Sequence, residues 1–407
     1  MDAAKHDAES SKRLPRTVWA LGLVSLFMDA SSELVHSLLP ALYVSLGISM
    51  GIVGLIEGIA EATAAIVKIF SGGLSDWIGK RKILAIAGYG LAALTKPLFP
   101  LAQSAGVVFA ARFIDRIGKG IRGAPRDALI ADVTSPAMRG AAYGLRQAMD
   151  TVGAFIGPLL AIALMFLLND NLRLVLWFAV IPAVLCLASL IFGVEEPSNI
   201  EAGRDRERSG KSGQLLQRAM LAEMSPAFWL VVVVGGLFAL ARFSEAFLTL
   251  RAMQLGLPIG LSPLVMVLMS VVFSLIAYPV GRLSDRMQRG PLLAIGLLCL
   301  IVADLLLGLA GSLPMALIGI VFWGLHMGLT QGLFSALVAD NAPGHLRGTA
   351  FGVFNLVNGL ALLLASAVAG SLWQFLGSAA TFYTGAAFAV AALVGLLALM
   401  KSGTWAH

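Results

Sequence analysis

The sequence has little of what water-soluble enzymes and binding proteins use. Charged residues make up only 13% of its 407 residues, against 58% hydrophobic residues, which is too little charge to cover a water-facing surface. Two cysteines and five histidines offer neither a disulfide framework nor a zinc motif. Neither a glycine-rich phosphate loop after a strand nor a nucleophile elbow is present. We therefore expect no enzyme, no metal site and no cofactor, with Cys186 and Cys299 serving as packing residues.

Long hydrophobic runs fill most of the chain instead. Runs of about 20 residues suit helices that cross a bilayer, whereas a membrane barrel needs alternating strands of about ten. Bounded by charge, glycine or proline, the runs lie near residues 18–46, 51–74, 83–101, 105–126, 141–167, 173–193, 226–250, 262–281, 291–311, 314–339, 348–375 and 380–400. They predict an all-α membrane protein of about twelve transmembrane helices.

The two halves of the chain repeat each other. Residues 128–132 (ALIAD) and Arg139-Gly140 recur 208 residues later, at 336–340 and Arg347-Gly348. The segment from Gly72 to Asp76 recurs 209 residues later, from Gly281 to Asp285. One near-constant offset across separate motifs indicates a parallel duplication. It predicts two pseudo-symmetric six-helix bundles, at 18–193 and 226–400, with a polar linker at 194–225 and tails at 1–17 and 401–407.

Positive charge alternates along the chain in a way that sets the orientation. The N-terminal tail, the turn at 80–82, the linker and the turn at 282–289 are basic, whereas the turns near 47, 103, 312 and 377 are nearly uncharged. By the positive-inside rule both termini are cytoplasmic. The net charge of +6 therefore reports topology and not a nucleic-acid partner. We expect a multi-pass protein of a cell membrane, in contact with lipids.

Two motifs connect the sequence to a known family. The segment Gly72-Gly-Leu-Ser-Asp76-Trp-Ile-Gly79-Lys80-Arg81-Lys82 resembles the signature turn between helices 2 and 3 of the major facilitator superfamily, with a weaker copy at Gly281. Gly153-xxx-Gly157-Pro158 is similar to the glycine–proline motif of its drug/proton antiporter branch, departing from the fuller pattern at Ala161. The resemblance covers nearly the whole chain and implies the two-bundle, alternating-access fold, with export of a solute against protons.

The signature turn is a candidate gate. Its glycines let helices approach, and Asp76 can meet a cation or a helix N-terminus. If Asp76 pairs with Arg122 or Arg126 in one access state only, the contact is a latch; a topological anchor is the alternative. The candidate gating residues are Gly72, Asp76, Gly79, Lys80, Arg81, Arg122, Arg126, Gly153, Gly157, Pro158 and Asp285.

Ionisable residues form narrow helical stripes in the first half. Each costs about 2.5 to 3.5 kcal/mol at mid-membrane, so they must face water or one another. The stripes are Asp29, Glu33 and His36; Glu57, Glu61 and Lys68; Arg112, Asp115, Arg116, Lys119, Arg122 and Arg126; and Arg146 and Asp150. At the 208-residue offset the third stripe becomes Ile320, Trp323, Gly324, Met327, Thr330 and Phe334. We expect ion chemistry in the first half and a more apolar wall in the second, with Glu245 as the exception.

These side chains are assigned roles by type. Burial favours a protonated carboxyl and a nearby cation favours the ionised form, so the candidate proton-coupling residues are Asp29, Glu33, Glu57 and Glu61. The candidate substrate-binding residues are His36, Arg112, Asp115, Arg116, Lys119, Arg146, Asp150 and Glu245. Ion pairs that only fix helix register, such as Asp115 with Arg112 or Arg116, are the alternative. His36 with Asp29 and Glu33 could also ligate a metal, and Lys96 is expected to reach toward the interface.

The leading hypothesis is a monomeric secondary active transporter that exchanges a small organic solute for protons. The excess of Arg and Lys on the span at 105–126 favours an alternative, a carrier of an anionic metabolite or a metal chelate. A membrane receptor that transports no solute is the alternative hypothesis from a different functional class. The sequence shows no ATP-binding module, so the energy for transport is expected from an ion gradient.

Overall fold

The computed structural model describes residues 14–78, 80–135, 138–196, 221, 223–284 and 287–401, without the side chains at 72–74, 76–78 and 345. Gly79 and Asp285 of the expected gate, and most of the expected linker, therefore lie outside the described residues, and Gly72 and Asp76 are described by their backbone alone.

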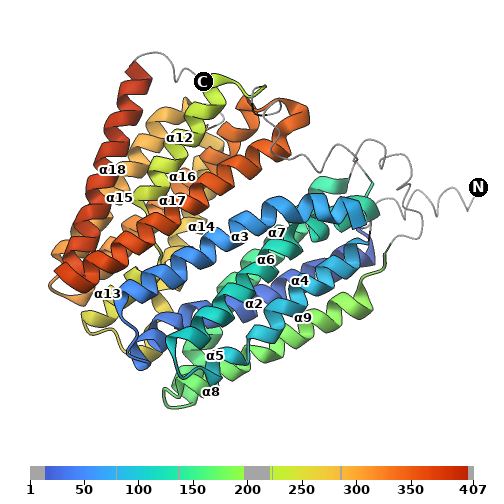
Figure 1. Cartoon of the computed structure of the whole chain (residues 1–407), viewed down its shortest axis with the longest axis horizontal. Helices are drawn as coiled ribbons and strands as arrows, with labels where there is room; N and C mark the ends of the chain where they lie inside the picture. The colour runs from blue at the N-terminus through green and yellow to red at the C-terminus, as the bar shows by residue number, and fades with distance from the viewer. Residues whose placement is uncertain are drawn as a thin grey trace, which may run out of the picture.

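All regular secondary structure in the described part of the chain is helical. The helices form two groups that lie side by side (Figure 1). The first bundle contains α2 (Arg16–Ser45), α3 (Met50–Ile78), α4 (Arg81–Thr95), α5 (Leu98–Leu101), α6 (Ala105–Val133), α7 (Arg139–Leu167), α8 (Leu172–Phe178) and α9 (Val180–Gly193). The second bundle contains α12 (Pro226–Ala241), α13 (Ala246–Gln254), η3 (Ile259–Leu261), α14 (Leu264–Ser284), α15 (Arg289–Leu309), α16 (Leu313–Asn341), η4 (Gly344–Leu346), α17 (Arg347–Leu376) and α18 (Ser378–Lys401). The predicted fold class is confirmed.

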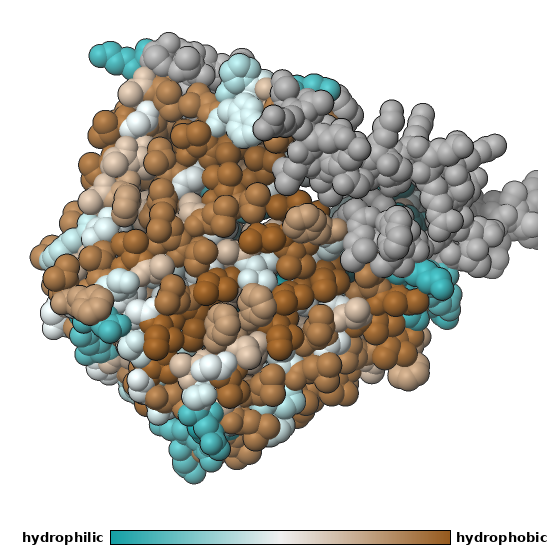
Figure 2. All heavy atoms as spheres, in the orientation of Figure 1, coloured by the Kyte–Doolittle hydropathy of each residue, from teal (hydrophilic) through white to brown (hydrophobic). Residues whose placement is uncertain are grey.

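The helices are built for a bilayer. Within the described ranges, 11 helical segments are long and apolar enough to cross a membrane; α6 is not one of them because of its charged stripe. Large apolar side chains lie exposed on the outside, such as Phe166 at 84% and Phe192 at 86%. Figure 2 shows a mostly hydrophobic face with hydrophilic residues toward its edges. This outer surface is suited to lipid rather than water.

Three of the expected spans are present but interrupted. Pro97 ends α4, because proline lacks an amide hydrogen and clashes with the preceding turn. A second break separates α8 from α9 at Ala179. The third, at residues 242–245, separates α12 from α13 and contains no proline. There the amide of Ser244 donates to Ser366 Oγ of α17 at 3.1 Å, so a tertiary contact replaces the helical one.

The predicted duplication is visible in side-chain contacts. Arg81 pairs with Asp132, joining α4 to α6, and Arg289 pairs with Asp340, joining α15 to α16. Arg139 donates to the Ala131 carbonyl and Arg347 donates to the Ala339 carbonyl. Both pairs of contacts are related by the 208-residue offset, which therefore holds for these helices in space as well as in sequence.

The bundles meet along α3 and α17 and at one end of the molecule. A Cβ added to Gly54 would lie 3.1 Å from Gly370 Cα, so this interface needs glycine. At the end where α2 finishes, here called the far end, the Gly51 amide donates to Gln374 Oε1 at 3.1 Å. A Cβ on Gly260 of η3 would lie 3.5 Å from Met165 Cβ of α7 at that same end. The far end is thus closed by contacts between the bundles.

Candidate functional site

A cavity of about 820 Å³ lies between the bundles. Its walls come from α2, α3, α6 and α7 on one side and from α12, α14, α16 and α17 on the other. A smaller cavity of about 280 Å³ lies deeper toward the far end, and both are lined by Glu33, Glu61, Lys119 and Arg242. The two cavities therefore adjoin one another, and they are treated below as one central space.

Helix α6 supplies a charged partner to most of its neighbours in the first bundle. Arg112 Nη2 lies 2.8 Å from Glu57 of α3, and Arg116 lies 3.6 Å from Glu61 of the same helix. Arg122 lies 3.9 Å from Asp29 of α2, and Arg126 lies 3.5 Å from Asp150 of α7. Pairing offsets the cost of removing these charges from water. The four arginines of the stripe predicted on α6 therefore cross-link helices.

Lys96 contradicts its prediction. It does not reach the interface, because its side chain is only 1% exposed and its Nζ lies 2.9 Å from Asp115 Oδ1. It also donates to Ser32 Oγ at 3.0 Å. Asp115 thus has Lys96 as its main partner, while Arg116 Nε lies 4.0 Å away. A buried cation beside a buried anion can stay charged at mid-membrane, so the lysine has no need to reach water.

Glu57 stands at the closed, deep end of the space. It is 1% exposed, accepts hydrogen bonds from Tyr43 Oη at 2.6 Å and Arg112 at 2.8 Å, and lies 3.5 Å from Ser244 Oγ of the second bundle. His36 lies between two carboxylates, with Nδ1 3.3 Å from Glu33 and Nε2 4.0 Å from Glu57. This network joins α2, α3 and α6 to the break between α12 and α13.

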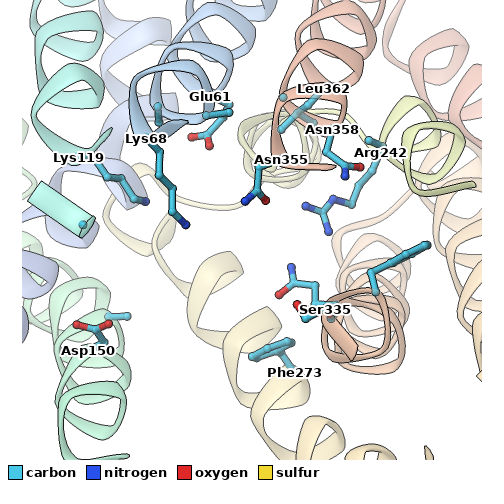
Figure 3. Close-up of a pocket in the computed structure, with 18 of the residues that line it drawn as sticks. Glu61, Lys68, Lys119, Asp150, Arg242, Phe273, Ser335, Asn355, Asn358 and Leu362 are labelled. Carbon is cyan, nitrogen blue, oxygen red and sulfur yellow. Dashed lines mark hydrogen bonds between the residues drawn. The ribbon is translucent and has the colours of Figure 1, made fainter. Parts of the chain in front are cut away.

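Three cations face the larger cavity without a partner. The side chains of Lys68, Lys119 and Arg242 make no ion pair or hydrogen bond within the described part of the chain. Figure 3 shows all three pointing into the opening, two from the first bundle and one from the second. The carboxylates that line the larger cavity differ, since each has a basic side chain within 4.0 Å: Asp29, Glu33, Glu61 and Asp150. The uncompensated charge there is positive, which favours negatively charged ligands.

The second bundle forms a wall that is polar but mostly uncharged. Among the described residues, Arg242 is its one Lys, Arg, Asp or Glu that lines the larger cavity. Asn355, Asn358 and Ser335 face the space beside Phe273 (Figure 3). The expectation of a more apolar wall is thus only half right, because aromatic rings and neutral hydrogen-bonding groups share the surface. Glu245 lines the smaller cavity without an ion pair within the described chain.

Most predicted site residues do gather at this space. The larger cavity is lined by Asp29, Glu33, Glu61, Lys119, Arg122, Arg126 and Asp150, and the smaller one by His36, Glu57, Arg116 and Glu245. Arg112, Asp115 and Arg146 line neither cavity; they stand behind it and hold Glu57, Lys96 and Asp150 respectively. Their predicted role in binding substrate stays a prediction, and the contacts described here are with other side chains of the first bundle.

The polar lining residues that the sequence did not assign to the site include Lys68, Arg242, Asn355 and Asn358. For Lys68 a signal existed, because it shares the narrow stripe of Glu57 and Glu61. For the asparagines only the repeat could have helped, since Asn358 occupies the position of Asp150 in the second half.

The described gating candidates hold α7 and α4 in place. A Cβ on Gly157 would lie 2.7 Å from the Ala30 carbonyl oxygen of α2, and Gly153 packs equally closely on Leu26. Pro158 is buried in α7. Lys80 is exposed, and Arg81 pairs with Asp132. The partners of Arg122 and Arg126 described here are Asp29 and Asp150, so the latch to Asp76 stays a prediction.

Known proteins resemble this chain over nearly its whole length. The sequence profile described as the Major Facilitator Superfamily matches residues 21–366 and 264–406. An uncharacterized MFS-type transporter of Methanocaldococcus jannaschii is 30% identical over 403 residues, which cover 96% of each chain. A probable 4-methylmuconolactone transporter of Cupriavidus pinatubonensis is 27% identical over 84% of this chain and 80% of its own. A crystal structure of a mutant nucleoside transporter, NupG, shares the fold with a TM-score of 0.79 at 12% identity, over 94% and 99% of the two chains.

Proposed function

This chain belongs to the major facilitator superfamily of membrane transporters, and from that premise we propose that it carries small organic anions across the membrane, coupled to protons. The observation that supports this is the set of unpaired cations, Lys68, Lys119 and Arg242, in a cavity whose carboxylates are paired. A volume of about 820 Å³ lies within the range of roughly 300 to 1,000 Å³ that small-molecule sites occupy.

Electrostatics links the anion to the proton. Glu33 and Glu61 line the same space as Lys119, so an anion bound at Lys119 places negative charge near both carboxylates. Like charges disfavour ionisation, so the bound anion favours protonation of Glu33 or Glu61. Protonation in turn frees His36 or Arg116 from its partner. Anion and proton therefore promote each other's binding, which is the condition for cotransport in one direction.

Antiport is the second candidate, and the glycine–proline motif supports it. Gly153, Gly157 and Pro158 are buried where α7 packs against α2, as the resemblance to the antiporter branch implies. Antiport needs a solute that competes with the proton, such as an organic cation that binds the ionised carboxylates. The two candidates thus predict solutes of opposite charge.

A liposome assay separates them. The purified protein is reconstituted with a pH-sensitive dye inside, and small carboxylates, their neutral amides and organic cations are added outside. We expect acidification of the lumen with carboxylates and no response to the amides. Alkalinisation with organic cations, together with silence toward carboxylates, would instead establish antiport and overturn the anion assignment.

Charge variants test the site itself. A charge-assisted hydrogen bond contributes about 1.5 to 3 kcal/mol, so Lys119→Gln and Arg242→Gln should each raise the half-saturating carboxylate concentration by about tenfold or more. Lys401→Gln is the matched control, because Lys401 is exposed at the end of α18. Glu33→Gln should retain carboxylate binding while losing proton flux. Unchanged carboxylate affinity in both cation variants would sink the proposed site.

A further inference from the structure

The second bundle contains a carboxyl group that the cavity network does not use. Asp304 of α15 is 0% exposed, and neither of its oxygens has a hydrogen-bond partner within the described part of the chain. The indole Nε1 of Trp323, on the adjacent helix α16, likewise lacks a partner there. A buried, unpartnered polar group is rare and calls for a functional or structural reason.

The surroundings of Asp304 are apolar. A Cβ on Gly385 of α18 would lie 2.6 Å from Asp304 Oδ2 and 3.0 Å from Phe243 Cε1, so the carboxyl sits where only glycine leaves room. The Phe243 ring lies 5.3 Å from the Trp323 ring and 5.5 Å from that of Phe382, measured between centroids. Phe243, which lies at the same Gly385 position as Asp304, thus belongs to a cluster of aromatic rings.

The titratable groups on the helices around α15 are engaged elsewhere. Arg251 of α13 donates to the carbonyls of Leu307 and Ala310, and His326 of α16 bonds to the Gly296 carbonyl. Tyr383 of α18 packs against Gly308. Asp340 of α16 pairs with Arg289, and Lys401 is exposed at the end of α18. No described cation forms an ion pair with Asp304. An ionised carboxylate in such a place costs several kcal/mol, so the group is kept as the neutral acid.

The duplication allows Asp304 to be compared with the matching position of the first bundle. At the 208-residue offset Asp304 corresponds to Lys96 and Trp323 to Asp115. In the first bundle those positions form the 2.9 Å ion pair. In the second bundle the position of Asp115 is taken by an indole, which can donate one hydrogen bond but carries no charge. The first bundle thus holds a permanent ion pair where the second holds an acid that needs its own proton.

One side chain, that of Phe243, both lines the central space and lies near this acid. Phe243 lies in the break between α12 and α13, and it lines the smaller cavity together with Arg242, Ser244 and Glu245. Its ring edge approaches the Gly385 position that Asp304 also contacts. If the break rearranges and Phe243 moves aside, water from the cavity reaches the carboxyl. The unpaired Arg242 then lies on the same wall as a source of positive charge.

We propose that Asp304 is a proton-binding site of the second bundle, filled and emptied through the break at residues 242–245. In the occluded arrangement, with Asp304 0% exposed, the proposed site holds its proton and the O–H bond is intact. When Phe243 moves, the O–H bond breaks, the proton passes to cavity water, and the electron pair stays on the carboxylate. The inference rests on the proton coupling proposed above and adds a site outside the charged network of the first bundle.

Infrared spectroscopy of the reconstituted protein tests the protonation state without any substrate. We expect the wild-type protein at neutral pH to show a carboxylic-acid C=O stretching band that Asp304→Asn lacks. Asp170→Asn, at an exposed carboxyl, should leave the band unchanged. If the Asp304→Asn spectrum matches the wild type in this region, Asp304 is ionised and the proposal is overturned.

Transport measurements test the role. Asparagine matches the shape of the protonated acid but cannot release a proton, so Asp304→Asn should lose at least tenfold in proton-driven uptake while keeping solute exchange at equal pH. A purely structural role predicts that Asp304→Asn and the wild type behave alike in both assays, which would refute the proposal. If the wild type itself shows no solute-dependent proton flux, the proton coupling proposed above fails, whereas the infrared result stands independently.

Discussion

The buried pair of Lys96 and Asp115 allows a quantitative test of the structure. The side chains are 1% and 7% exposed and 2.9 Å apart, which places them in the regime of fully desolvated ion pairs. Removing one partner from such a pair costs about 3 to 5 kcal/mol, because the other charge stays buried without compensation. Lys96→Met should therefore lower the free energy of unfolding by about that amount.

The repeat supplies the control pair. Arg289 and Asp340 also join neighbouring helices, but their side chains are 20% and 57% exposed. Exposed pairs contribute about 0.2 to 1 kcal/mol, so Arg289→Gln should cost less than about 1 kcal/mol. The double variant Lys96→Met with Asp115→Leu should regain most of the stability lost by Lys96→Met, because replacing both buried charges with apolar groups is often close to neutral.

The assay is denaturant unfolding in detergent micelles, followed by tryptophan fluorescence, for the wild type, the two single variants and the double variant. A cost below about 1 kcal/mol for Lys96→Met would place Lys96 in water. A double variant no more stable than Lys96→Met would show that the two residues are not partners. Either result would refute the arrangement of α4, α5 and α6 described above.

Two further outcomes follow from the helix contacts. Gly157→Ala should destabilise the protein by about 1 to 3 kcal/mol, because its Cβ would meet the Ala30 carbonyl oxygen at 2.7 Å. Gly144→Ala on the same helix is the control, since its Cβ would meet nothing within 4 Å and should cost no stability. Equal unfolding free energies for the two variants would argue against the close packing of α7 on α2. Cysteines at Met165 and Gly260, whose Cβ positions are 3.5 Å apart, should form a disulfide under oxidising conditions. That bond should stop transport by holding the far end closed, and reduction should restore it; full transport in the oxidised, cross-linked protein would contradict alternating access through this end.

The helices and the repeat were predictable because each left a strong signal in the sequence. Apolar runs of spanning length are required by the bilayer, and the 208-residue offset recurs in both motif and contact. The break at residues 242–245 left no such signal. It depends on Ser366, a residue 122 positions away, and not on a local proline or glycine.

The sequence predicted which helices carry charged residues toward the site, but it did not predict which of these residues form ion pairs with one another. Ionisable residues in a membrane must gather at water or at each other, so the first-half stripes led directly to the cavity. Arg116 and Lys119 share one stripe of α6, yet only Arg116 meets a carboxylate of α3. Which of them stays free depends on how α3 and α6 cross. Asn355 and Asn358 were invisible because neutral amides in a helix carry no comparable cost.

The unequal construction of the two bundles has a consequence for how this protein can diverge. On the first-bundle wall a mutation of Asp29 leaves the buried Arg122 without its ion-pair partner within the described chain, so such a change needs a compensating one. On the second-bundle wall Asn355 and Ser335 form no ion pair within the described chain, and Ser335 bonds only within its own helix. Single substitutions there alter the shape and polarity of the cavity without leaving a charge unpaired. New substrate preferences should therefore arise by stepwise mutation of α16 and α17, while the charged half of the cavity is inherited unchanged.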